Sequence, residues 1–244
     1  MFCAFITKAQ PNLILNGSFE QNSLTQCHNE MNSFAYNNSI DYSTSYGHRI
    51  TFIEDSCLFC NAPTYWGGGA QEGHWFAGLA SKVFYNQPGT VWLDAKFSLE
   101  LSSPLSNEKN YMLSFYIKEL PDIPVNSTGC LESSSNYIEV GISNSATNFG
   151  TPIYTSPVGL NADWQQYSIV FNTQNMEEYL TVEVGTGDTN NYAVLVDNFV
   201  LEETNASAIN EVNSNNRNLL KIVDVLGRES KAIKNTPLFY IYSD

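Results

Sequence analysis

Apolar and polar side chains alternate over several stretches of the chain. In residues 90–101 apolar residues occupy every second position from Val91 to Leu101, while Trp92, Asp94 and Lys96 stand between them. Alternation with a period of two predicts a strand with one buried and one solvent-facing side. The same period recurs in residues 111–117, 138–142, 167–171 and 180–184, and no helical period of useful length appears before residue 205.

Segments rich in Pro, Gly, Asn and Ser separate these strands, at residues 103–104, 107–110, 121–129, 148–152 and 185–191. Many short alternating strands between such turns indicate an all-β sandwich. Residues 21–74 are less regular and hold all three histidines and three of the cysteines. A long irregular segment in a folded domain is usually functional or held by cross-links.

The charge of the chain narrows the classes of function. There are 11 Lys and Arg against 25 Asp and Glu, which gives a formal net charge of -14. Such an acidic protein does not bind nucleic acid, and acidic polysaccharides are disfavoured as ligands. The hydrophobic fraction of 43% predicts a folded chain, and no apolar stretch is long enough to predict a membrane span.

The first nine residues, 1–9, read as the remnant of a secretory signal peptide. An apolar run precedes Thr7 and Ala9, which are small residues at the −3 and −1 positions of a signal-peptidase cleavage site. The basic start of such a peptide is missing, so we expect the sequence to begin inside the signal. A buried first strand is the alternative interpretation.

Four cysteines follow this segment: Cys27, Cys57, Cys60 and Cys130. An even number in an exported protein predicts disulfides, and we favour Cys27 paired with Cys57 or Cys60. The Cys57-Leu-Phe-Cys60 spacing also suits half of a zinc site, with Cys27 and His28 as the other half, or a redox pair. The sequence leaves these alternatives open.

The composition changes near residue 204. An Asn- and Ser-rich linker, residues 205–218, leads to two short predicted strands within residues 219–244. The segment from Lys221 to Glu229, which contains Asp-Val-Leu-Gly-Arg, and the later Thr236–Tyr242 resemble the C-terminal sorting domain of the type IX secretion system. The final Lys-rich strand of that family is absent, so we expect a truncated domain. The resemblance implies the type IX secretion machinery as a partner and a secreted or outer-surface location.

Residues 10–204 resemble the jelly-roll domains of carbohydrate-binding modules and their galactose-binding-like relatives. Three motifs carry the resemblance: Asn12–Glu20 (Asn-Leu-Ile-Leu-Asn-Gly-Ser-Phe-Glu) at the entry, Trp164–Tyr167 ahead of a strand, and Val194–Leu201 with Asp197-Asn198 at the exit. The resemblance implies a jelly-roll β-sandwich whose first and last strands pair. It also implies a structural Ca²⁺ at their junction, held by carboxylates of Glu20 and Asp197 and the carbonyl of Ser18. In the alternative interpretation Glu20 caps a turn and Asp197 ends a strand.

Side chains on the solvent-facing side of the predicted strands suggest how a sugar could bind. Aromatic rings stack on the apolar faces of sugars, and Trp92, Tyr116 and Tyr137 occupy outward positions. If their strands are neighbours, these rings form a platform bordered by the polar side chains of Asp94, Lys96, Lys118 and Glu139. Trp66 and Trp75, near the glycines at 67–69, are a second candidate site. In the alternative interpretation Trp92 is covered by a loop or belongs to the core of a second layer.

No motif identifies an enzyme. The three histidines are not spaced as a metal motif, and no Gly-x-Ser-x-Gly elbow is present. The sequence therefore predicts a secreted or cell-surface, non-catalytic carbohydrate-binding module with a polysaccharide or surface glycan as its partner. A structural or adhesive surface protein without a small ligand is the alternative, followed by a β-sandwich polysaccharide lyase or glycosidase.

Overall fold

The computed structural model describes residues 11–48, 50–55, 69–86, 89–119, 137–158, 160, 162–185, 192–204, 219–224, 228 and 238–242. The chain divides into two compact units, residues 1–208 and 209–244. In the second unit, β13 (Leu219–Asp224) pairs with β14 (Leu238–Tyr242) in an antiparallel ribbon, at the place where two short strands were predicted. No helix among the described residues is long and apolar enough to cross a membrane.

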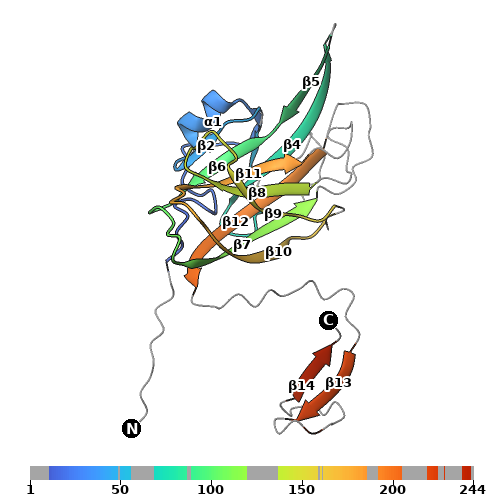
Figure 1. The fold of residues 1–244 in the computed structure, drawn as a ribbon. Helices are drawn as coiled ribbons and strands as arrows, with labels where there is room; N and C mark the ends of the chain where they lie inside the picture. Colours follow the sequence, from blue (N-terminus) through green and yellow to red (C-terminus); the bar gives the residue numbers. More distant parts are fainter. Residues whose placement is uncertain are drawn as a thin grey trace. The chain divides into compact units, whose positions relative to one another are not determined.

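The first unit contains two antiparallel sheets, which Figure 1 shows stacked face to face. The larger sheet has seven strands, in the order β1-β3-β4-β12-β7-β10, with β5 paired to β4. Their bounds are β1 (His28–Met31), β3 (Ile50–Glu54), β4 (Trp75–Asn86), β5 (Gly89–Asp94), β7 (Asn110–Glu119), β10 (Gln165–Asn172) and β12 (Tyr192–Thr204).

The smaller sheet has five strands, in the order β2-β6-β11-β8-β9. Their bounds are β2 (Ser43–Ser45), β6 (Lys96–Glu100), β8 (Tyr137–Ser143), β9 (Thr151–Thr155) and β11 (Tyr179–Gly185). Apolar side chains from both sheets form one core, in which Phe19, Phe97 and Phe199 meet edge to face. These two sheets confirm the predicted all-β jelly-roll sandwich.

The predicted single strand at residues 90–101 is divided between the two sheets. Strand β5 ends at Asp94 in the seven-stranded sheet, and β6 begins at Lys96 in the five-stranded sheet. The buried Ala95 lies between them. Strands that pass from one sheet to the other make the corners of a sandwich. The alternation of side chains continues through such a corner, so the sequence pattern could not reveal it.

The other alternating stretches correspond to strands. Strands β7, β8 and β11 bury their apolar rows, as predicted, and Leu113, Phe115 and Val140 have no exposed surface. In β10 the inward row is only half-buried. Lys118 was predicted to face solvent but is fully buried, because the outer side of its sheet is covered by residues 69–75 and Trp164.

The entry segment joins the last strand, as the resemblance implied. The side chain of Asn12 donates to the carbonyl of Phe199 and accepts from the amide of Leu201, at 2.9 Å each, and the Phe199 amide donates to the Gly17 carbonyl. The segment is not itself a strand: Ile14 makes one isolated bridge to Leu101, and residues 15–18 form turns.

The irregular segment also holds elements that the sequence did not predict. A short helix, α1 (Ser33–Ser39), begins at Asn32, whose side chain accepts from the amide of Ala35. Strand β3 has no alternation because four successive residues from Ile50 to Ile53 are buried. Its outward side lies under other parts of the chain, so its polar row is missing from the sequence.

Candidate functional site

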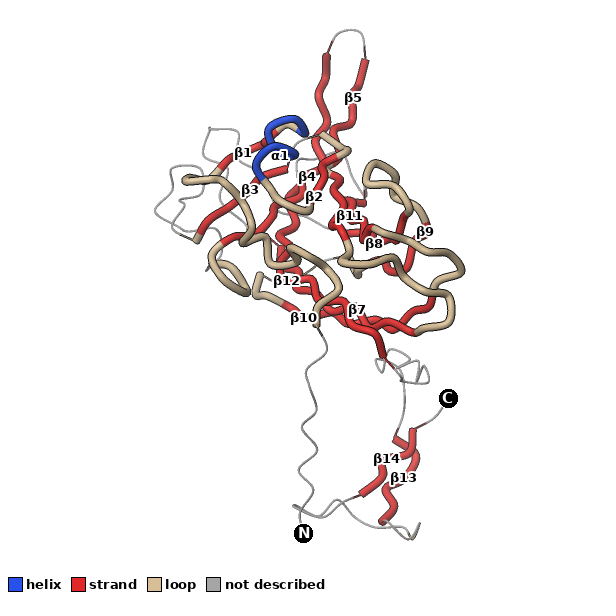
Figure 2. The backbone as a smooth tube through the Cα atoms, turned by 90° about the vertical axis from the view of Figure 1, so that its left-hand side faces the viewer, coloured by secondary structure: helices blue, strands red, loops and turns tan. Residues whose placement is uncertain are grey.

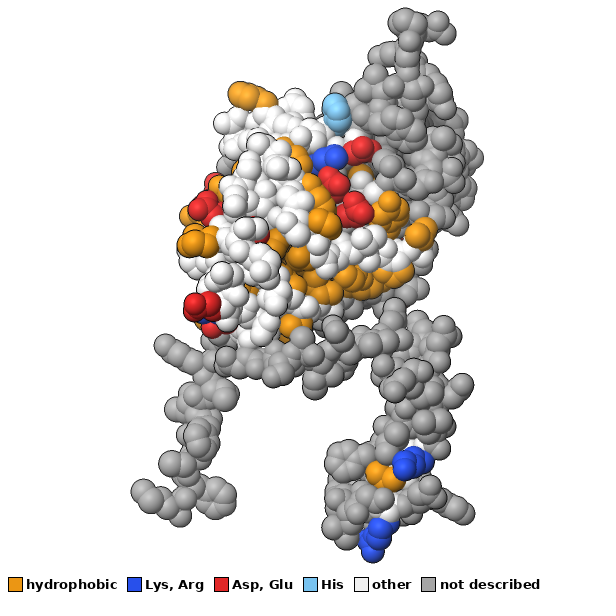
Figure 3. Space-filling view, viewed as in Figure 1, with side chains coloured by type: hydrophobic (Ala, Val, Ile, Leu, Met, Phe, Trp, Pro, Cys, Tyr) orange, Lys and Arg blue, Asp and Glu red, His pale blue; other side chains and the backbone are white. Residues whose placement is uncertain are grey.

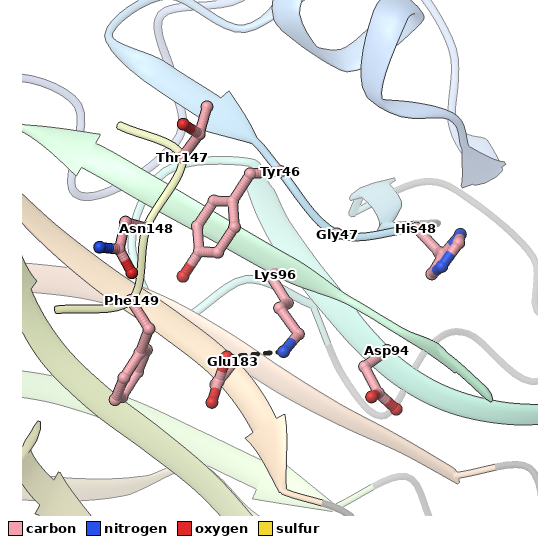
Figure 4. A pocket seen from close by; sticks show the side chains of 9 residues that line it. All are labelled: Tyr46, Gly47, His48, Asp94, Lys96, Thr147, Asn148, Phe149 and Glu183. Carbon is pink, nitrogen blue, oxygen red and sulfur yellow. Dashed lines mark ion pairs between the residues drawn. The ribbon is translucent and has the colours of Figure 1, made fainter. Parts of the chain in front are cut away.

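A cavity of about 580 Å³ lies on the outer side of the five-stranded sheet. Residues 46–48 after β2 form its first wall, and residues 147–149 between β8 and β9 form its second wall. Asp94 and Lys96 at the corner between β5 and β6, together with Glu183 on β11, complete the lining. Figure 4 shows the rings of Tyr46 and Phe149 on one side of the cavity and His48 and Asp94 on the other. Aromatic and hydrogen-bonding side chains therefore share one concave surface.

An ion pair lies at the floor of this cavity. The ammonium of Lys96 stands 2.9 Å from a carboxylate oxygen of Glu183, and both side chains are largely shielded from solvent. The strand register places these residues directly opposite each other, with Glu139 next in the same row. Figure 3 shows a basic and several acidic side chains gathered close together on this face of the molecule. The pair offers a ligand both donors and acceptors in fixed positions.

Gly47 allows the first wall to approach the sheet closely. The amides of Tyr46 and Gly47 donate to the carbonyl of Lys96, and the amide of His48 donates to the carbonyl of Asp94. A Cβ atom at residue 47 would lie 2.5 Å from the Asp94 carbonyl oxygen and 2.6 Å from the Lys96 nitrogen. Only a glycine fits this position without moving the wall.

Two buried hydroxyls hold the second wall down. Thr181 Oγ1 donates to the carbonyl of Phe149 at 2.6 Å, and Ser98 Oγ donates to the carbonyl of Ala146 at 2.9 Å. Gly150 then turns the chain back into β9 with φ of 75°, a conformation that favours glycine. These contacts hold the backbone that carries Phe149 in place.

The ring of Tyr46 forms a fixed part of the wall. Its hydroxyl is buried next to the Thr181 side chain. Burial raises the pKa of Tyr46, and the nearby charge of Glu183 raises it further. The side chain therefore stays neutral at physiological pH and contributes an uncharged ring to the cavity.

The structure separates the residues of the predicted aromatic platform. Tyr137 lies on β8 in the five-stranded sheet and packs over Gly185, whereas Tyr116 lies on β7 in the other sheet. The two strands are not neighbours, so these rings do not share one surface. Trp92 belongs to β5, but its side chain lies outside the described part of the structure, and so does Trp66.

Trp75 is half-buried at the start of β4. Its ring stacks on Phe52 with centroids 5.2 Å apart, and its amide donates to Glu20. The ring packs against the core cluster. Part of its surface is therefore occupied by packing, and a glycan contact at Trp75 stays a prediction.

The buried Lys118 forms a second polar cluster, on the outer side of the seven-stranded sheet. Its ammonium lies 4.3 Å from the centroid of the Trp164 ring and 3.3 Å from the Gly69 carbonyl oxygen, which also accepts from the indole of Trp164 at 3.0 Å. Burial lowers the pKa of Lys118 to about 8, although the charge of Asp197 opposes this. The cluster anchors Gly69 and thereby the start of the loop that crosses this sheet.

The two predicted calcium carboxylates hold the same loop. Asp197 is fully buried and accepts from the amides of Gln71, Glu72 and Asn198, and Glu20 accepts from the amides of His74 and Trp75. Each carboxylate thus accepts backbone amides, and a Ca²⁺ ion would have to share or replace those contacts.

No group of three or more His, Cys, Asp or Glu in the described ranges could hold a metal. Calcium at Glu20, Asp197 and the carbonyl of Ser18 stays a prediction. Asp197 is fully buried and accepts hydrogen bonds from loop 69–75, so its role in this structure is to hold that loop.

The cysteine predictions fall largely outside the described residues. Cys57, Cys60 and Cys130 lie in undescribed segments, so the pairing stays a prediction. The Cys27 sulfur lies 2.9 Å from the amide nitrogen of Glu54, at the end of β3. This position leads directly into the segment that contains Cys57 and Cys60.

No sequence pattern marked most residues of the cavity as part of a binding site. Asp94 and Lys96 were predicted to face outward, but Tyr46, Phe149 and Glu183 were not singled out. Tyr46 and Phe149 lie in irregular segments, and Glu183 occupies a polar position of an ordinary alternating strand. Their meeting depends on which strands are neighbours, and the order β2-β6-β11-β8 is set by the tertiary fold.

No protein-family model matches the chain, and no curated protein matches it. Solved structures with a similar arrangement include TmCBM61 in complex with beta-1,4-galactotriose, at 12% identity and a TM-score of 0.44 over 80% of this chain and 99% of that one. The CBM22-1 xylan-binding domain from Paenibacillus barcinonensis Xyn10C is similar at 12% identity and a TM-score of 0.41, over 82% and 99%. A family 16 carbohydrate-binding module gives 15% identity and a TM-score of 0.39, over 78% and 99%. Likenesses this distant carry no information about a shared ligand.

Proposed function

We propose that this protein is a carbohydrate-binding module that takes a neutral glycan into the cavity on the five-stranded sheet. The observation that carries the proposal is the placement of the Tyr46 and Phe149 rings beside the Lys96–Glu183 ion pair in one concave site. Sugars present apolar C–H faces and polar hydroxyls on the same ring. A site that recognises them needs both kinds of surface close together.

The size and rigidity of the cavity support this ligand class. A volume of about 580 Å³ is within the range of small-molecule sites. Gly47 and the Thr181 hydroxyl hold the two walls in place through backbone contacts. A site that is already formed loses less conformational entropy when a ligand binds.

Charge favours a neutral sugar over an acidic one. Among the described residues around the cavity, Asp94, Glu183 and Glu139 are acidic and Lys96 is basic, and the chain carries a formal net charge of -14. A uronate or sulfate group would be repelled by this field.

The proposal also includes export and a non-catalytic role. The signal-like residues 1–9 and the sorting-domain-like residues 219–244 support a secreted or outer-surface location, with the type IX machinery as a partner during transport. Trp66, Trp92 and Tyr137 stay candidates for additional contacts with a longer glycan.

Binding to a panel of neutral and acidic polysaccharides, measured by affinity electrophoresis and calorimetry, tests the proposal. Phe149→Ala and Lys96→Met should each weaken binding about 5- to 30-fold, because each removes about 1–2 kcal/mol of contact. The matched control is Lys109→Met, which breaks a more exposed ion pair, Lys109–Glu203 at 2.6 Å, outside the cavity lining.

The control variant should bind as the parent does. If Phe149→Ala and Lys96→Met retain the affinity of the parent for every glycan it binds, the cavity is not the site. If no glycan binds at all, the structural or adhesive alternative replaces the proposal. Release of sugar products would instead establish an enzyme.

A further inference from the structure

Strand β10 forms one edge of the seven-stranded sheet and has no protection against pairing. All eight residues from Gln165 to Asn172 pair with β7 in one continuous register. None of the eight is charged, and none is Pro or Gly. In the described part of the chain, the backbone hydrogen bonds of β10 run to β7 alone, so its outer edge presents a row of free amides and carbonyls. Figure 2 shows β10 at the margin of the sandwich.

Three other edge strands of the sandwich, β1, β2 and β9, carry features that prevent pairing. Strand β9 has five residues, contains Pro152 and has an irregular register with β8. Strand β2 has three residues, and β1 has four with a register shift. Short length, proline and bulges are the usual devices that keep edge strands from joining another sheet. Only β10, of these four, is long, regular and uncharged.

The side chains of β10 are also poorly covered. The inward residues Tyr167, Ile169 and Phe171 pack against the core but stay half-exposed, and the outward Val170 is 36% exposed. Tyr154 of β9 continues this apolar surface, with its ring centroid 6.0 Å from that of Tyr167. In Figure 3 hydrophobic side chains form a band in the region where Figure 1 places β9 and β10. Addition of one more strand would bury much of this surface.

We propose that β10 pairs with β10 of a second copy of this chain, in antiparallel orientation, so that the two seven-stranded sheets become one continuous sheet. The sequence of the strand is complementary to itself. With Ile169 opposite Ile169 of the other copy, Tyr167 of each copy faces Phe171 of the other on the core side. On the outer side Ser168 faces Val170. Aromatic and β-branched cross-strand pairs of this kind are favourable.

Charge explains why two copies would meet at β10 and not at an acidic part of the surface. Two chains of net charge -14 repel each other, and an interface between them requires a surface without acidic side chains. The eight residues of β10 are such a surface, and its two halves match each other across a two-fold axis. A closed symmetric dimer of this type uses the same patch on both subunits and leaves no further edge of β10 open.

Sedimentation velocity of the full chain over a range of concentrations tests the proposal. The edge variant is Ser168→Lys with Val170→Lys, which brings lysines of the two copies together at the proposed interface. The matched control is Ser114→Lys with Met112→Lys. These residues pair with Ser168 and Val170 on the same face but lie on β7, an inner strand that cannot form an intermolecular pair. Melting curves and circular dichroism verify that both variants fold.

The parent and the control should sediment as dimers, and the edge variant as a monomer of half the mass. Hydrogen exchange adds a second readout. The amides on the free edge of β10 should exchange more than about tenfold more slowly in the dimer than in the edge variant. A monomeric parent at high micromolar concentration overturns the proposal. A dimer that persists in the edge variant, or that is lost equally in the control, also overturns it. Glycan binding is measured separately and does not enter this test.

Discussion

The buried Asp197 carboxyl should make the stability of the protein fall as pH rises towards neutrality. Its side chain has no exposed surface, and this burial raises its pKa from 3.8 to about 7. The three backbone amides that donate to it oppose the rise, and the charge of Glu20 adds to it. In the unfolded chain the same carboxyl titrates near its ordinary value.

The sign of the effect follows from these two pKa values. A group whose pKa is higher in the folded state binds protons more tightly there, so its stabilising contribution is complete below the unfolded pKa. That contribution is lost as pH rises through about 7. A pKa difference of about three pH units corresponds to about 4 kcal/mol, at about 1.4 kcal/mol per unit. Lys118, the neighbouring cation, keeps its charge over most of this range because its pKa is about 8.

Asp197→Asn tests this prediction because asparagine has nearly the same shape and does not titrate. At pH 4 to 5 the two proteins should differ by no more than about 1–2 kcal/mol, because the protonated carboxyl of the parent, like the amide of the variant, has one accepting oxygen and one donating group. Between pH 4.5 and pH 7 the parent should lose about 3 kcal/mol relative to the variant, so above pH 7 the variant should be the more stable protein. Urea unfolding at half-unit steps from pH 4 to pH 8 gives the two stability curves. Parallel curves for parent and variant would refute the assignment of the pH dependence to Asp197.

Three further predictions concern other parts of the molecule. Gly47→Ala should lower the free energy of unfolding by about 1–3 kcal/mol and weaken glycan binding, because its Cβ would press on the carbonyl of Asp94; unchanged melting and affinity would contradict the role given to this glycine. If calcium binds as the resemblance implies, a chelator should lower the melting temperature of the parent and leave Glu20→Gln unaffected; a parent indifferent to the chelator would exclude the ion. Trp164→Phe should cost about 1–2 kcal/mol, since it removes the indole hydrogen bond to Gly69 and weakens the cation–π contact; equilibrium unfolding measures this, and no change would show that the cluster around Lys118 is not held by the indole.

The alternation of side chains determined which residues build the core. Leu113, Val140 and Val182 are buried at the positions where a period of two placed them, because a strand must direct successive side chains to opposite sides. The entry and exit motifs were also informative at long range. Asn12 reaches residue 199 through its side chain, and this contact ties together two ends of the sandwich that lie far apart in the sequence.

The pattern failed where a strand is covered on both sides or where it turns a corner. Residues 50–53 are all buried, so β3 has no alternating signature, and Ala95 bends a regular pattern from one sheet into the other. Lys118 occupies a polar position of its strand yet is enclosed by an aromatic ring and a loop carbonyl. Periodicity records only which side of a strand a residue faces, and not what else in the chain covers that side.

The sequence by itself thus determined the class of the fold, its acidity and the rows of core residues, because these depend on local geometry and composition. The tertiary structure decided which outward rows are neighbours. It separated Tyr116 from Tyr137 and joined Tyr46 and Phe149 to the Lys96–Glu183 pair, residues that no spacing connects. The physical reason is that strand order in a sandwich is set by the packing of the two sheets as a whole, and a binding surface forms only after that order exists.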